Sequence, residues 1–111
     1  MSVKENINTN NVITSACTYE LKDFIPKEDA EVIKKLKNEK AIILAKTNLS
    51  ELANYMDVRI PRGYSSKHGQ NINLYNPLII SPLVSSSGNA ASITANIGVA
   101  SLFVRCSRSN K

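Results

Sequence analysis

A continuous apolar run at residues 41–45, reading Ala-Ile-Ile-Leu-Ala, is the feature that most restricts the fold of this chain. Strands covered on both faces have near-continuous apolar sequences, and such strands belong mainly to parallel sheets flanked by helices. A second apolar run occupies residues 99–104. A shorter one, at residues 3–8, is part apolar and leads into a polar loop, as a strand would. These segments predict strands of a parallel sheet.

Helical patterns lie between the predicted strands. Pro26 precedes two acidic residues, which is typical of a helix start, and apolar side chains then recur at helical spacing opposite a lysine-rich face. These apolar positions are Ala30, Val32, Ile33 and Leu36. Asn48 and Glu51 have the spacing of a capping box, which predicts a short helix as far as about residue 55 or 56. Because strands and helices alternate, the predicted class is α/β.

A third helix is predicted at residues 87–97, where Gly98 provides a natural stop. Its predicted inward side chains are Ala90, Ala91, Ile93, Thr94 and Ile97. The helix follows three consecutive serines and a glycine at residues 85–88. Such a start offers backbone N–H groups and small hydroxyls, so it can be a simple N-cap, an anion site or a place for acyl chemistry. A phosphate-binding P-loop is disfavoured, because no Lys-Ser/Thr pair follows the glycine.

Composition narrows the classes of function. The net charge is +5, but the lysines are interspersed with acids and few aromatic side chains are available for base stacking, which excludes a nucleic-acid role. The apolar runs are too short to cross a membrane, and the start of the chain has no apolar leader, so we expect a cytoplasmic protein without membrane contact.

Metal-ligating residues are sparse in the sequence. Cys17 and Cys106 lie far apart without a nearby second ligand pair, so two free thiols are expected in a reducing compartment. His68 is the single histidine, and it lies in a long loop predicted at residues 57–84, rich in Pro, Gly, Ser and Asn. A histidine without an acid or thiol cluster in the sequence does not predict a metal site. We therefore expect neither a metal nor a cofactor.

Several segments, in order, resemble the amidase signature family, whose members hydrolyse or transfer carboxamide nitrogen. They are the Val-Lys-Glu-Asn-Ile of residues 3–7, residues 41–51, Gly69-Gln70 with Asn73 and Tyr75, and the Ser-Ser-Ser-Gly of residues 85–88. The resemblance covers nearly the whole chain, although family members are several times longer. It implies that residues 1–111 form a fragment of an amidase-signature domain, an incomplete α/β/α core with a mixed sheet flanked by helices.

The resemblance also implies the site residues. The family uses a Ser/cis-Ser/Lys triad, in which Lys4 would be the base, Ser85 the bridging serine on a cis peptide bond, and Ser109 the nucleophile. A serine hydroxyl becomes a strong nucleophile when a neighbour accepts its proton, and a buried lysine can be the final acceptor. The implied substrate is a small-molecule carboxamide. A simple amidase and the A component of a glutamine-dependent amidotransferase both fit the pattern.

The chain departs from the family pattern at several glycines. Leu83 and Val84 replace the glycines before the serine run, while Cys17 and His68 replace two others. Arginines at positions 105 and 108 lie in the segment that builds the family's oxyanion hole. We therefore expect a truncated, inactive chain. The alternative is a non-catalytic fragment or interaction module that self-associates through exposed strand edges at residues 41–45 and 99–104.

Overall fold

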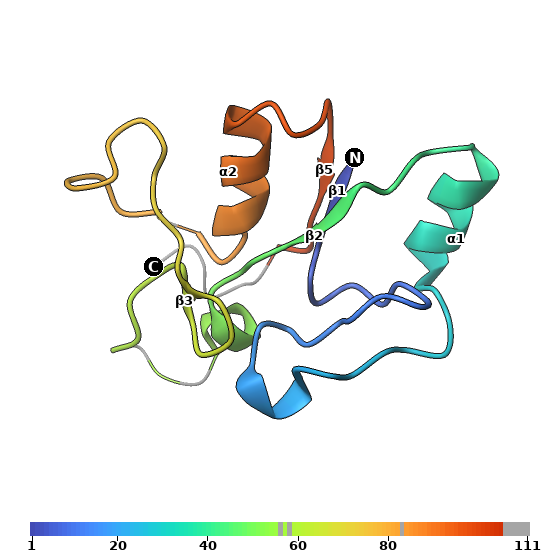
Figure 1. Ribbon diagram of the computed structural model, residues 1–111, viewed down its shortest axis with the longest axis horizontal. Coiled ribbons are helices and arrows are strands. Elements are labelled where there is room, and N and C mark those ends of the chain that lie inside the picture. The colour runs from blue at the N-terminus through green and yellow to red at the C-terminus, as the bar shows by residue number, and fades with distance from the viewer. Residues whose placement is uncertain (56, 58, 83, 106–111) are drawn as a thin grey trace.

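The computed structural model describes residues 1–55, 57, 59–82 and 84–105 (Figure 1). Its elements, in chain order, are β1 (Ser2–Lys4), the 3-10 helix η1 (Tyr19–Leu21), α1 (Glu31–Asn38), β2 (Ala45–Thr47), the 3-10 helix η2 (Glu51–Asn54), β3 (Tyr64–Ser65), β4 (Gly69–Gln70), α2 (Ser87–Thr94) and β5 (Ser101–Leu102). Within these residues, no helix has the length and apolar character needed to cross a bilayer.

The central sheet has the strand order β2-β1-β5, and both pairings are parallel. Val3 is paired with Lys46 on one side and with Leu102 on the other. In Figure 1, α2 and α1 lie on opposite sides of this sheet. The predicted α/β class and the strand at the start of the chain are therefore confirmed.

The two faces of β1 contact different layers, because side chains alternate along a strand. Val3 is fully buried with Ile7 and with Ile33 of α1, and these three residues form the apolar core. Ser2 and Lys4 point the other way, toward α2: the Ser2 hydroxyl lies 2.9 Å from that of Ser92. Burying a side chain such as Val3 or Ile33 is worth about 1.5–3 kcal/mol, so this small cluster anchors α1 to the sheet.

The inward face of α2 is polar, which corrects the prediction. Ser87, Asn89 and Ser92 are its buried residues, whereas Ala90, Ile93, Thr94 and Ile97 are exposed and Ala91 is half-buried. Asn89 Nδ2 donates to the carbonyl of Leu102 at 2.9 Å and to Ser101 Oγ at 2.7 Å. Periodicity identified the helix but not its buried face, because hydrogen bonds to β1 and β5 hold the polar side inward.

The apolar runs form shorter strands than predicted. β2 begins only at Ala45, and Ile42 and Leu44 are 73% and 57% exposed. β5 comprises only Ser101–Leu102, and Val99 is fully exposed. Within the described part of the chain, β1 alone pairs with a strand on each side and is buried along its whole length. The exposed side chains of the other two apolar runs show that these runs are not covered on both faces, which corrects the prediction.

The predicted capping box is also wrong. Asn48 Oδ1 accepts hydrogen bonds from the N–H of Leu49 and the hydroxyl of Ser65, and Glu51 accepts one from the N–H of Ser66. The segment forms the 3-10 helix η2, in which Leu52 and Ala53 have left-handed φ values of 46° and 58°. Partners from the β3–β4 hairpin thus replace the local cap.

Two other predicted segments are refined. α1 is present but begins at Glu31, several residues after Pro26, because the Asp29 carboxylate instead accepts hydrogen bonds from the Asn10 N–H and the Lys37 amine, both at 2.7 Å. The region predicted as one long loop contains the antiparallel hairpin β3–β4, in which Tyr64 pairs with Gln70.

Lys46 on β2 connects the sheet to the first loop, residues 5–18 between β1 and η1, through hydrogen bonds. Its amine donates to the carbonyl of Ile7 and to the hydroxyls of Thr9 and Thr14, the latter two at 3.0 and 3.2 Å. Burial of the amine lowers its pKa from 10.5 to about 8, although the negative charges of Glu5 and Asp29 oppose this shift.

The shifted pKa of Lys46 predicts a pH-dependent stability. Between pH 8 and 10.5 the unfolded lysine binds a proton that the folded one has released, so Lys46 contributes a free energy of unfolding that rises with pH across this window. The raised pKa of the Cys17 thiol acts in the opposite direction above about pH 9, so the contribution of Lys46 is measured as the difference between the wild type and a variant without the amine. Lys46→Met should remove this contribution. Urea unfolding of both proteins at several pH values tests it, and stability profiles that run parallel throughout the window would contradict it.

Close contact between α2 and the loop after β2 gives a second prediction. A Cβ atom on Gly88 would lie 2.3 Å from the carbonyl oxygen of Asn48 and 2.7 Å from its nitrogen, so backbone would have to move. We expect Gly88→Ala to lower the free energy of unfolding by about 2–3 kcal/mol in chemical denaturation. Gly98→Ala is the matched control: its Cβ would meet nothing closer than Leu44 Cδ1 at 3.5 Å, and an equal loss there would refute the explanation.

Candidate active site

The structure brings Lys4 and Ser85 together. Lys4 ends β1 and is fully buried, and its amine donates to Ser85 Oγ at 3.0 Å and to the carbonyl of Val104 at 3.2 Å. The two partners lie 81 residues apart in sequence. An amine at this distance from a hydroxyl can, in its neutral form, accept the proton of that hydroxyl.

The serine run is held from two sides at the start of α2. Ser85, Ser86 and Ser87 are all buried. The carbonyl of Ser85 accepts a hydrogen bond from the Ser50 N–H at 3.1 Å, and Ser87 Oγ accepts one from Asn71 Nδ2 at 2.7 Å. The predicted helix start at this run is confirmed, and Ser85 is fixed relative to the strand that carries Lys4.

The cis peptide bond implied for Ser85 is absent: the peptide bonds between described residues are all trans. The trans isomer of a non-proline bond is favoured by about 3 kcal/mol, so it is the form a chain adopts unless its surroundings impose the other. Ser109, the implied nucleophile, lies outside the described residues, as do Leu83, Cys106 and Arg108.

A cavity of about 690 Å³ opens beside Ser85, the hydrogen-bond partner of Lys4. Its lining includes Ser85, Ser86, Asn89, Phe103 and Arg105. The buried hydroxyls lie next to apolar side chains from α2 and from the segment after β5, and Arg105 contributes a positive charge. A small organic molecule with a polar group fits such a space.

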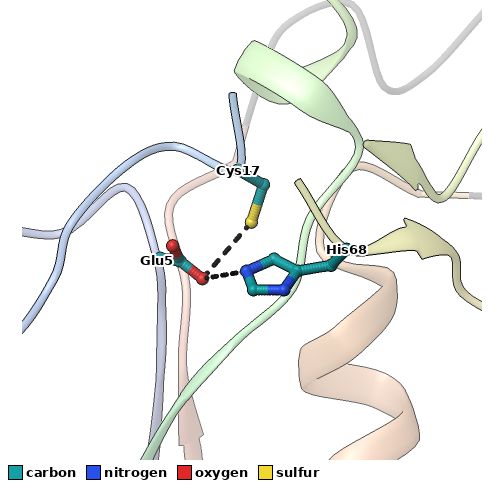
Figure 2. A group of neighbouring side chains, drawn as sticks. All are labelled: Glu5, Cys17 and His68. Carbon is teal, nitrogen blue, oxygen red and sulfur yellow. Dashed lines mark hydrogen bonds and ion pairs between the residues drawn. The ribbon is translucent and has the colours of Figure 1, made fainter. Parts of the chain in front are cut away.

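A second group of polar side chains surrounds Glu5, the residue after Lys4. Glu5 Oε1 accepts hydrogen bonds from Ser15 and from the Lys67 amine, the latter at 2.6 Å. The Cys17 thiol donates to Glu5 Oε2 at 3.5 Å, and His68 Nε2 lies 3.1 Å from the same oxygen (Figure 2). Burial alone would raise the pKa of Glu5, but the bonds from Lys67 and Ser15 outweigh it and lower the pKa.

Sequence reasoning missed this cluster. The predicted free thiol of Cys17 is confirmed, but His68 has no partner in the sequence-based prediction, and in the structure both side chains contact one carboxylate oxygen. Burial first and the charge of Glu5 second raise the pKa of Cys17 to about 12, so the thiol is protonated. The sequence contains one hint of this cluster, because Cys17 and His68 both replace glycines of the family pattern. Their spacing in the sequence does not indicate that the two side chains contact the same group.

The fold and the buried Lys4–Ser85 pair define an α/β unit with a Ser–Lys pair at a helix start. The family model described as Amidase matches residues 1–102, and the chain belongs to this family. It is 39% identical to a probable amidase of Arabidopsis thaliana over 90% of this chain and 20% of that protein. It is 42% identical to the A component of the glutamyl-tRNA(Gln) amidotransferase of Lawsonia intracellularis, over 86% of this chain and 18% of the relative.

Solved structures agree with this assignment. An amidase family protein from Bacillus anthracis superposes with a TM-score of 0.87 at 46% identity, and the peptide amidase of Stenotrophomonas maltophilia with 0.85 at 38%. Each likeness covers 90% of this chain and 20% of the other. The chain thus spans about a fifth of the length of the proteins it matches.

Proposed function

We propose that Lys4 and Ser85 are the base and the bridging hydroxyl of a Ser/Ser/Lys centre that hydrolyses a carboxamide C–N bond. The observation that carries this proposal is the hydrogen bond of 3.0 Å between the Lys4 amine and Ser85 Oγ, formed at a buried position beside a cavity. Membership of the amidase family supports it.

In the proposed reaction, Ser109 attacks the amide carbon while its proton passes to Ser85, and the proton of Ser85 passes to the neutral amine of Lys4. The tetrahedral intermediate then collapses, the C–N bond breaks, and the nitrogen leaves with a proton returned through the same two groups. Water hydrolyses the resulting acyl-serine ester by the reverse proton path. The cavity beside Ser85 would hold a small-molecule carboxamide.

We further propose that the 111-residue chain by itself has little or no activity. Phe103, Val104 and Arg105 occupy the segment where the family pattern has small residues and glycine. Oxyanion donors are worth about 3–4 kcal/mol each, and bulky side chains restrict the backbone conformations that aim such donors at the reacting atom. Ammonia release from small carboxamides should therefore stay at the level of Lys4→Met.

A chimera tests the Lys4–Ser85 pair separately from the residues after 102. Residues 1–102 would replace the matching fifth of the Stenotrophomonas peptide amidase, which then supplies the nucleophile and oxyanion loop. We expect the chimera to hydrolyse peptide amides, and Lys4→Met or Ser85→Ala to reduce kcat by about 10²–10⁴-fold. Lys27→Met, at an exposed lysine, is the matched control and should leave the rate unchanged.

Circular dichroism of each chimera establishes that it is folded. A folded chimera without activity, or one whose Lys4→Met variant keeps its rate, would refute the proposed roles. Because the segment after residue 102 is absent from the chimera, neither outcome depends on whether the chain by itself is active.

We also propose that the chain self-associates through the outer edges of β2 and β5. Among the residues that the structure describes, each of these strands pairs with β1 and with no second strand. Apolar side chains beside them are exposed, among them Ile42, Leu44 and Val99. Unpaired strand edges with apolar neighbours pair readily with other chains.

Sedimentation velocity should therefore show dimers or larger species whose population rises with concentration. Ile42→Lys should shift the distribution toward monomer, because the added charge opposes apolar contact at the β2 edge. Asn38→Lys adds the same charge at an exposed polar position and should not. A monomer at all concentrations, or an equal effect of both variants, would count against edge pairing.

A further inference from the structure

We propose that Glu5, Cys17 and His68 form a binding site for one divalent transition metal of borderline softness, with Zn²⁺ as its type. The three side chains come from different parts of the chain: Glu5 directly follows β1, Cys17 lies in the first loop, and His68 lies between β3 and β4. Their ligand atoms all lie within 4.8 Å of one another. Thiolate, imidazole and carboxylate are the ligand types that Zn²⁺ uses.

The distances fit a shared metal ion. With Zn–S of about 2.3 Å and Zn–O and Zn–N of about 2.0 Å, tetrahedral geometry places S and O about 3.5 Å apart and N and O about 3.3 Å apart. The observed separations are 3.5 Å for Cys17 Sγ to Glu5 Oε2 and 3.1 Å for His68 Nε2 to the same oxygen. The third pair, Cys17 Sγ and a His68 ring nitrogen, lies within 4.8 Å, and side-chain rotations that bring these two atoms to about 3.5 Å would complete the site.

The carboxylate is oriented by groups behind it. Glu5 Oε1 is occupied by Ser15 and by the Lys67 amine, which leaves Oε2 to face Cys17 and His68. Ser15 Oγ also accepts the N–H of Cys17 at 3.1 Å, so a single hydroxyl positions two of the ligands. Outer hydrogen bonds of this kind hold metal ligands in place, and they increase affinity.

The site is reachable from solvent. Cys17 and Glu5 are buried, but the His68 side chain is 40% exposed and lies on the solvent side. A metal ion would enter past His68, bind the thiolate after the Cys17 proton leaves to solvent, and keep water as its fourth ligand. The nearby charge of Lys67 opposes this binding and is partly offset by the negative charge gained at Cys17.

A Cys–His nucleophile pair is the competing interpretation. In such a pair the imidazole contacts the sulfur and accepts its proton. Here the thiol donates to Glu5, and His68 contacts the same carboxylate oxygen. Both side chains thus converge on that oxygen, as ligands of one ion do.

Titration of the full chain with Co²⁺ provides the test, because thiolate coordination to Co²⁺ produces a charge-transfer absorption band. The chain has two cysteines and one histidine, so the ligands can be assigned. We expect a band that saturates at one equivalent and disappears when Zn²⁺ is added. Cys17→Ser should abolish it, and Cys106→Ser, the matched control, should retain it.

His68→Gln provides a variant at a partly exposed position, and circular dichroism should show that it folds like the wild type. Its Co²⁺ affinity should fall more than about tenfold. Zn²⁺ should raise the unfolding temperature of the wild type and of Cys106→Ser, but not of His68→Gln. The proposal fails if the wild type gives no thiolate band, if the band follows Cys106, or if a folded His68→Gln binds as tightly as the wild type.

Discussion

The buried amine of Lys4 is the constraint on which much of this structure depends. An amine away from water needs acceptors, because leaving it without them costs several kcal/mol. Ser85 Oγ and the carbonyl of Val104 fill this need, and they belong to segments 81 and 100 residues further along the chain. Satisfying one side chain of β1 therefore positions the start of α2 and the segment after β5.

Small polar residues let the layers approach closely around that amine. Ser2, Ser92 and Asn89 form hydrogen bonds across the interface between α2 and the sheet, and Gly88 lies against the backbone of Asn48. Directional bonds of this kind set the position of α2 more sharply than apolar packing would. This explains why α2 turns its polar face inward while the alanines and isoleucines predicted for the core remain largely outside.

Adjacent residues at the end of β1 belong to two chemical groups. Lys4 contacts Ser85 beside the cavity, whereas the Glu5 carboxylate contacts the Cys17 thiol and the His68 imidazole. β1 ends at Lys4, and Glu5 begins a turn that the hydrogen bond from the Ile7 N–H to the Lys4 carbonyl closes at 3.0 Å, so the two neighbouring side chains contact different partners. The proposed hydrolytic centre and the proposed metal site therefore use adjacent residues of one short segment without sharing a side chain.

The sequence by itself determined the α/β class, the existence of both α-helices and, through the family resemblance, the pairing of Lys4 with Ser85. Those features depend on local periodicity or on a motif, which the order of residues records directly. Only the tertiary structure decided which face of α2 is buried, how short β2 and β5 are, and that Cys17 and His68 meet at Glu5. These outcomes depend on contacts between distant segments, and such contacts are set by how the layers pack rather than by any local pattern.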